Sequence, residues 1–278
     1  MRHAFAPSAT ALLALLLAAC TGKSAPETVL LDAAGSAHEG MLGWQSVTDE
    51  TVRLATTGTV DVDVQVFAGD VTVVWKPTLR HTEVTVRRTG SHGWFRESES
   101  MESLGEIRYT VTLEQAEGRD RAVVRAGTDH VEPHFQAVDV EIAVPDLGAV
   151  RILTDRGNVW VEGNRGAAEV KSSHGKIRLM TPWKIDTSVS LVTSDGDIDL
   201  RLRGESTGAV DAATVGGQVK TRIKYGKWVA THGENDADSL RATMNDGTNP
   251  ITLRTSNADV MLSVLPNPVS QNPAPAIW

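Results

Sequence analysis

The chain has 278 residues, of which 41% are hydrophobic and 22% are charged, enough for one or two globular domains. Its formal net charge is -8, so no surplus of basic residues is available to neutralise phosphates. This balance argues against nucleic acid as a partner. Cys20 is the single cysteine, which excludes an intrachain disulfide.

The N-terminus has the features of an export signal. Arg2 and His3 precede an apolar run that is too short for a permanent transmembrane helix and that ends at Cys20. Leu17-Ala18-Ala19-Cys20 resembles the lipobox of bacterial lipoproteins. The resemblance implies cleavage after Ala19 and acylation of Cys20, which would anchor the protein in a membrane. In a diderm cell, the threonine after Cys20 resembles the outer-membrane sorting pattern. An ordinary leader with a chance cysteine is the alternative.

Changes in composition and periodicity divide the rest of the chain. We expect a signal peptide over 1–19, the lipidated cysteine and a tether over 20–50, and an N-terminal β region over 51–137. A repeat domain follows over 138–265, and prolines exclude a sheet in the tail, 266–278. Alternation in the N-terminal region predicts strands at 52–56, 60–66, 70–75, 82–87, 107–113 and 122–125.

Two stretches of the N-terminal region lack any periodicity. Residues 90–100 are predicted to form a loop, and residues 127–137 are predicted to be irregular. Together they make the segment 90–137 a long excursion from the β pattern. No amphipathic helix is expected beyond the leader.

A repeated pattern organises the chain from about Val138 to Leu265. Each copy has a short alternating strand, a polar bend closed by glycine, and a second alternating strand. A Thr or Ser lies three positions before the bend, and apolar residues lie five before and two after it. A fainter copy surrounds Gly69. The bend position is held in turn by Gly157, Gly175, Gly196, Gly217 and Ala258, and the position two after it by Val159, Ile177, Ile198, Val219 and Val260.

The pattern has a direct physical meaning. Period-2 alternation places one set of side chains on a single face of a strand, and glycine permits a sharp bend. The Thr or Ser hydroxyl can bond nearby backbone groups. Recurrence at about 20 residues is typical of a β-solenoid, and five or six coils at ~4.8 Å would make a stack about 25–30 Å long. A β-sandwich is the alternative, but it does not require the same residues at the same offset. The sequence therefore predicts an all-β solenoid with an irregular N-terminal β region.

The repeat region resembles the bacterial "putative adhesin" family of cell-envelope β-solenoid domains. The resemblance implies a cell-envelope location and, by the family's name, adhesion; it supplies no catalytic residues. Ala258 at a bend position and the excursion across 90–137 depart from the family pattern. The matching motifs are Val140-x-Ile142-x-Val144-Pro145, Thr154-x-x-Gly157-x-Val159, Thr193-x-x-Gly196-Asp-Ile198 and Thr255-Ser-Asn-Ala-Asp-Val260.

Three patterns could carry chemistry. Gly204-Glu-Ser206-Thr-Gly208 matches the G-x-S-x-G of serine hydrolases, but no helix follows it, so we expect a loop. Asp195, Asp197 and Asp199 are weak calcium candidates, because the sixth position of an EF-hand loop would be Leu200; solvated carboxylates are the better interpretation. In His130-Val-Glu132-Pro-His134, the proline prevents the helical presentation of a zinc site. No metal or cofactor site is predicted.

Tryptophan is the unusual feature of the composition, with seven residues. Trp160 lies between inward Val159 and Val161 and should face outward. It marks either a binding surface for protein or glycan, or a side chain that covers a neighbouring loop such as the 90–137 excursion.

These observations favour a non-enzymatic, lipid-anchored protein of the cell envelope that displays a β-solenoid face to a protein or a glycan. A structural component that assembles through the open ends of the solenoid is the alternative. An enzyme that acts on envelope polymers ranks third.

Overall fold

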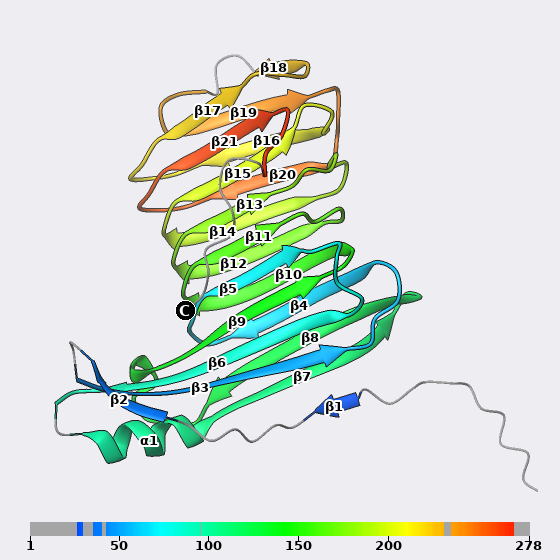
Figure 1. Ribbon diagram of the computed structural model, residues 1–278. Helices are drawn as coiled ribbons and strands as arrows, with labels where there is room; N and C mark the ends of the chain where they lie inside the picture. The colour runs from blue at the N-terminus through cyan, green and yellow to red at the C-terminus, as the bar shows by residue number, and fades with distance from the viewer. Residues whose placement is uncertain (1–26, 30–35, 41–42, 95, 231–234, 270–278) are drawn as a thin grey trace, which may run out of the picture.

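The computed structural model describes residues 27–29, 36–40, 43–94, 96–230 and 235–269. These residues fold into two long sheets that face each other and extend along one axis (Figure 1). The predicted signal peptide, Cys20 and most of the proline-rich tail lie outside the described residues.

The first sheet has 11 strands among the described residues. Their spatial order is β1 (Glu27–Val29), β7 (Ile107–Ala116), β8 (Arg119–Thr128), β4 (Val60–Val66), β10 (Leu147–Arg156), β12 (Ala168–His174), β14 (Val189–Asp195), β20 (Pro250–Arg254), β16 (Gly208–Ala213), β19 (Ser239–Met244) and β18 (Trp228–Ala230).

The second sheet has 10 described strands. From the same end of the stack as β18, their order is β17 (Val219–Ile223), β21 (Val260–Leu265), β15 (Ile198–Arg203), β13 (Ile177–Met180), β11 (Val159–Glu162), β5 (Val71–Trp75), β9 (Gln136–Val144), β6 (Thr82–His92), β3 (Gly43–Leu54) and β2 (Ser36–Gly40).

Each sequence repeat forms one coil with a strand in each sheet. The coils pair in parallel and in register, so that Ile152 lies beside Val170 and Val170 beside Leu191. Across the bend, Ile177 pairs with Ile198 in the same way. This geometry confirms the predicted β-solenoid and the frame anchored on the bend glycines.

The inward side chains of both sheets form one hydrophobic core. Burying each such side chain contributes ~1.5–3 kcal/mol, and a coil gains this only when a neighbouring coil covers it. The core residues with no exposed surface include Ile152, Val170, Ile177, Leu179, Leu191, Ile198, Leu200 and Val260.

The order of the coils in space differs from their order in the chain. The first coil, β4–β5, lies between β8–β9 and β10–β11. The last coil, β20–β21, lies between β14–β15 and β16–β17. Both terminal coils are thus paired on two sides. The strands β16 to β19, which precede the last coil in the chain, form this end of the stack.

The stack is longer than the five or six repeats suggested. Eleven strands at ~4.8 Å each give about 50 Å, roughly twice the expected length. The difference arises because the N-terminal β region continues the same two sheets. In particular, β9 pairs with both β5 and β6.

Three local predictions are wrong. Residues 43–50, assigned to the tether, belong to β3, which pairs with β6 along its whole length. Of residues 90–100, assigned to a loop, 90–92 complete β6 and 97–100 begin the helix α1 (Glu97–Glu106). The irregular segment 127–137 contains the end of β8, the 3-10 helix η1 (Pro133–Phe135) and the start of β9.

The helix α1 was not predicted from the sequence, for a physical reason. Its buried residues are Ser100, Ser103 and Leu104, so its contact face is mostly hydroxyl rather than apolar. Pattern analysis searches for apolar residues at helical spacing, and α1 does not have them.

Candidate functional site

The bends of successive coils form a column along one side of the stack. Gly157 and Gly175 have φ values of 131° and 144°, which favour glycine. A Cβ atom added at Gly175 would overlap the carbonyl oxygen of Gly157. Close stacking of the bends therefore requires glycine at these positions.

Hydroxyl groups bridge the bends of neighbouring coils. Thr193 donates a hydrogen bond to the carbonyl of Gly175 (3.1 Å), and Thr214 donates to that of Ala258 (2.7 Å). Thr255 donates to Gly196 (3.0 Å). The predicted role of the Thr or Ser before the bend is confirmed, although each of these acceptors lies in the next coil of the stack.

At five of the bends, the residue after the bend adds a second set of bonds, here called the bend ladder. A side-chain oxygen at this position accepts a hydrogen bond from the backbone N–H at the same position of the next coil. The acceptor–donor pairs are Asp139–Asp70 (2.8 Å), Asp70–Asn158 (2.7 Å), Asn158–Lys176 (3.0 Å), Asp197–Asp259 (3.3 Å) and Asp259–Gln218 (2.9 Å).

Burial affects the first member of the ladder most. The pKa of the Asp139 carboxyl is raised from its usual value near 3.8, chiefly because burial disfavours the charged form. The backbone N–H of Asp70 opposes this shift, while the nearby Asp70 carboxylate adds to it. The column of bends is consequently a structural element. It includes one carboxylate, that of Asp139, whose charged form is disfavoured by burial.

The three aspartates considered for calcium each contact different basic side chains. Asp195 contacts His174 (3.2 Å), and Asp197 contacts Lys176 (3.1 Å). Asp199 lies between two guanidinium groups, those of Arg178 (2.9 Å) and Arg201 (2.8 Å). The described residues contain no group of three His, Cys, Asp or Glu side chains able to hold a metal ion.

Trp160 faces outward from the second sheet, as its position in the pattern predicted. It is half-buried, and the Arg178 guanidinium carbon lies 4.9 Å from its ring centroid. This cation–π contact covers one face of the indole, and Asp199 holds the Arg178 guanidinium in an ion pair. Trp160 is therefore already packed by its own sheet.

Two other tryptophans pack at the ends of the strands. Trp75 donates from Nε1 to the carbonyl of Pro145 (3.0 Å) and meets Trp183 edge to face at 5.2 Å. The Arg165 guanidinium carbon lies 3.8 Å from the Trp183 ring centroid. These aromatic side chains cover loops at the coil corners, not the 90–137 excursion.

The G-x-S-x-G sequence is part of a loop, as expected. Ser206 has no exposed surface, and its hydroxyl accepts a hydrogen bond from the backbone N–H of Ile185 at 3.1 Å. A strand, β16, follows the motif instead of a helix. A buried hydroxyl in this setting cannot reach a substrate as a nucleophile.

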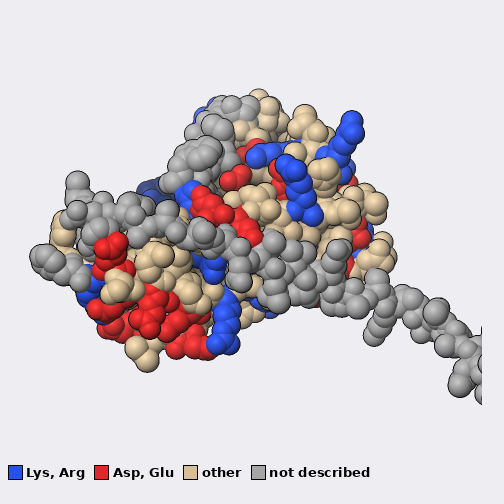
Figure 2. Space-filling view, turned by 60° about the horizontal axis from the view of Figure 1, so that its bottom comes forward, with Lys and Arg blue, Asp and Glu red and all other residues tan. Residues whose placement is uncertain are grey.

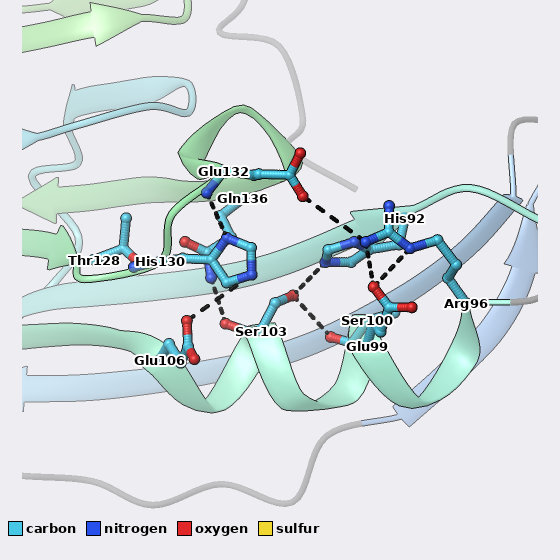
Figure 3. A network of polar contacts seen from close by, with 10 residues as sticks. All are labelled: His92, Arg96, Glu99, Ser100, Ser103, Glu106, Thr128, His130, Glu132 and Gln136. Carbon is cyan, nitrogen blue, oxygen red and sulfur yellow. Dashed lines mark hydrogen bonds and ion pairs between the residues drawn. The ribbon is translucent and has the colours of Figure 1, made fainter.

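A polar network, absent from the sequence prediction, holds α1 against β6 (Figure 3). His92, at the end of β6, is 2% exposed and its Nε2 lies 2.8 Å from the Ser103 hydroxyl. Ser100 donates to the carbonyl of Gly90 at 2.9 Å. Gln136 donates to the carbonyl of Ser103 at 2.5 Å. The serines of α1 therefore replace the apolar face of an ordinary packed helix.

The segment 127–137 closes this network from the other side (Figure 3). The Phe135 ring lies 4.8 Å from that of His92, and His130 lies 5.8 Å from it. His130 accepts a hydrogen bond from the N–H of Glu132 at 2.9 Å. The stretch from His130 to His134, considered above as a metal site, makes local packing contacts: the ring centroids of His134 and Phe135 lie 4.1 Å apart.

The environment keeps His92 neutral near neutral pH. Burial lowers its pKa below the usual 6.5, and the Arg96 and His130 charges lower it further. Although His92 touches a serine hydroxyl, Ser103 is only 1% exposed. The pair positions a helix and does not form an accessible nucleophile.

Charged side chains differ between the two ends of the stack. Acidic residues gather on the face that includes α1, seen from below in Figure 2. The helix itself supplies Glu97, Glu99, Glu102 and Glu106. At the opposite end, β17 and the following turn carry only basic charges, Lys220, Arg222, Lys224 and Lys227.

These features define an all-β, solenoid-like protein whose polar clusters serve packing. The sequence matches the family described as Toastrack DUF4097 over residues 107–263. The chain belongs to this family, a family of domains of unknown function. The match begins at β7, so part of the segment regarded as an excursion belongs to the family fold. The chain matches no curated protein at a significant level.

A solved structure with the same fold carries an adhesin-like name. A "putative cell adhesion protein" from Clostridium sporogenes ATCC 15579 aligns with a TM-score of 0.54 and 10% identity, covering 79% of this chain and 100% of that one. A "putative adhesin" from Bacteroides fragilis NCTC 9343 aligns with a TM-score of 0.34 and 10% identity, covering 79% and 97%. The predicted resemblance to this adhesin-like family is confirmed.

Proposed function

We propose that this protein is a non-enzymatic, lipid-anchored component of the cell envelope that displays its β-solenoid to a protein or a glycan. The observation that carries the proposal is the position of the N-terminal strand. β1 begins at Glu27 and pairs with β7 at the end of the stack that bears α1 (Figure 1). Lipid attached to Cys20 would hold that end near the membrane.

The short connection limits how far the base can move. Residues 21–26 separate Cys20 from β1 and span at most roughly 20–25 Å when fully extended. The stack itself is about 50 Å long. Lipid attachment would place α1 at the membrane side and the β17–β18 end outward. In the described part of the chain, the helices are too short or too polar to span a bilayer.

The ends of the sheets favour display over stacking of copies. The edge strand β18 is only three residues long, and the edge strand β17 is rich in basic residues. Short and charged edges are features by which proteins prevent strand pairing between copies. The bend ladder and the hydroxyl bridges keep the coils rigid, so that outward side chains have fixed positions.

Anchoring is tested by detergent partitioning of the protein produced in a bacterial host. The wild type should enter the detergent phase, and Cys20→Ala should remain in the aqueous phase because it cannot be acylated. Equal partitioning of the two proteins would contradict lipid anchoring.

Orientation is tested by energy transfer to headgroup-labelled lipid in vesicles. Because acylated Cys20 leaves no free thiol, Met101→Cys or Val215→Cys supplies a single labelling site. Both side chains are exposed, Met101 on α1 (41%) and Val215 in the bend before β17 (82%). We expect strong transfer from position 101 and weak transfer from position 215. Equal transfer from the two sites would overturn the upright orientation.

A further inference from the structure

Among the described residues, no strand pairs with one of the two sides of the edge strand β17. It pairs with β21 on one side only and ends the second sheet. The carbonyl of Gln218 accepts from Val260, and Lys224 donates to Val264, so the backbone groups of the even-numbered residues face β21. The odd-numbered residues face away: Val219 donates to Ala237 (2.9 Å), beside the end of β17. Thr221 and Ile223 therefore direct their N–H and C=O groups to the unpaired side.

The outward side chains of this edge are basic. Lys220, Arg222 and Lys224 are exposed and alternate along the strand, so they share one face. Lys220 pairs with Asp259 at 2.5 Å. Arg222 and Lys224 have no ion-pair partner among the described residues. The whole stretch 216–230 contains no acidic residue, although the protein carries a net charge of -8.

Charge and backbone geometry together select one kind of partner. A second copy of β17 would place bases opposite bases, which disfavours pairing. An extended segment with carboxylates at every second residue would place acids opposite bases, while its backbone satisfies Thr221 and Ile223. We propose that the β17 edge binds an acidic, extended segment of a partner protein, which adds one strand to the second sheet.

This proposal rests on the display function above and gives it a partner class. The site lies at the end of the stack farthest from α1 and from the proposed anchor (Figure 1). Main-chain hydrogen bonds supply affinity in such strand addition, and the charged side chains supply selectivity. Tyr225, which is 51% exposed, follows directly and extends the contact surface beyond the strand.

The first test uses the full-length protein in detergent and a capped synthetic peptide that alternates glutamate with threonine. Binding is followed by fluorescence anisotropy. The double variant Arg222→Glu/Lys224→Glu should weaken binding by about tenfold or more, because two attractive pairs become repulsive. The control Arg80→Glu/Arg119→Glu makes the same charge change at exposed bases several strands away and should change binding less than about twofold.

The second test separates strand addition from simple charge attraction. Thr221→Pro removes the N–H on the unpaired side and leaves the charge unchanged; edge strands tolerate such a proline. It should weaken peptide binding by at least about tenfold, whereas Thr221→Val should have little effect. A peptide that is N-methylated at alternate residues should also lose binding, and this measurement does not depend on the folding of a variant.

A sulfated polysaccharide provides the comparison for charge alone. Its binding should respond to the Glu variants but not to Thr221→Pro. Strand addition is overturned if the acidic peptide fails to bind the wild type, or if N-methylation and Thr221→Pro both leave its binding unchanged. Neither outcome affects the partitioning of Cys20→Ala, so failure of this proposal and failure of membrane anchoring can be distinguished.

Discussion

The interior coils and the end coil of the stack share one sequence frame but differ in burial. Ile198 and Leu200, in β15, have no exposed surface. The matching residues of β17 are Val219, which is half-buried, and Thr221, which is exposed. β15 pairs on both sides, whereas β21 is the only described strand that pairs with β17. Neighbouring coils, and not the local sequence alone, determine whether a frame position is buried.

The comparison also explains why the last coil of the chain is well packed. Residues 250–265 follow the exposed end segment in sequence, yet Val260 and Leu262 are fully buried. Their coil lies between β14–β15 and β16–β17. The exposed end of the stack is consequently tied to the core by covalent connections on both of its sides, which limits fraying.

The largest expected effect comes from placing a charge in the interior coil. Ile198→Asp should lower the free energy of unfolding by at least ~4 kcal/mol, because it removes an apolar contact and buries an unpaired carboxylate. Val219→Asp, at the same frame position of the end coil, should cost less than about 1 kcal/mol. Urea unfolding measures both. Similar losses in the two variants would show that the end coil is covered by something else.

The bend glycines should give the next largest effect. Gly175→Ala combines an unfavourable φ with overlap on the Gly157 carbonyl, and should destabilise by ~2–4 kcal/mol. Gly93, between β6 and α1, has open space around it and no positive φ, so Gly93→Ala is the matched control. Its unfolding midpoint should stay near that of the wild type. A tolerated Gly175→Ala would mean that adjacent coils can separate at the bend.

Much of this architecture could be predicted from the sequence because it repeats. Residues at a fixed offset, such as Val159, Ile177 and Ile198, occupy equivalent positions in successive coils, so their pattern identifies the fold. The insertion of the β4–β5 and β20–β21 coils between other coils could not be predicted. Every coil presents a similar apolar edge to its neighbours, so the frame does not encode which coils lie side by side.

The polar clusters were harder to predict than the core. The bend ladder has a sequence signal, because an Asp or Asn directly follows the bend at Asp70, Asn158, Asp197 and Asp259. The hydrogen bonds of these side chains could not be predicted, because their donors lie in the neighbouring coil. The network around His92 joins residues from β6, α1 and the 127–137 segment, which no local pattern connects. The basic residues at 220–227 can be read from the sequence. That they lie along an edge able to accept another strand follows only from the position of β17 at the end of its sheet.

Removing the hydroxyl bridges tests whether the bends of the interior and end coils contribute equally to stability. Thr193 and Thr214 are 3% and 6% exposed, so the end coil keeps this bend position buried although the side chains of β17 are half-buried or exposed. Thr193→Val should cost ~0.5–1.5 kcal/mol by loss of one hydrogen bond. Thr214→Val should cost at least as much, because the Thr214 hydroxyl also accepts a hydrogen bond from the N–H of Gly217 (3.2 Å). Thermal unfolding of both variants is the measurement. A loss confined to Thr193→Val would place the whole end coil, bend included, outside the cooperative core.

The smallest effect is expected at Asp139, where the sign of the pH dependence is informative. Because its pKa is higher in the folded than in the unfolded protein, the folded state binds the proton more tightly. Its contribution to stability is therefore favourable below about pH 4 and is lost as pH rises through the raised pKa. Asp139→Asn keeps an oxygen acceptor for the N–H of Asp70 but cannot ionise.

The Asn variant should be more stable than the wild type at pH 7, by less than about 1 kcal/mol, and equally stable near pH 3. Asp259→Asn provides the control at the other end of the ladder. The pKa of Asp259 is lowered, first by the Lys220 ammonium and then by the N–H of Gln218, so its loss should destabilise at pH 7. Stability changes of opposite sign at pH 7 would establish which effect dominates at each position. Burial would determine the contribution of the Asp139 carboxylate within the stack, and ion pairing would determine that of Asp259 near the exposed end. A destabilised Asp139→Asn at pH 7 would instead assign the Asp139 carboxylate a favourable charge interaction, with Arg87 the nearest candidate.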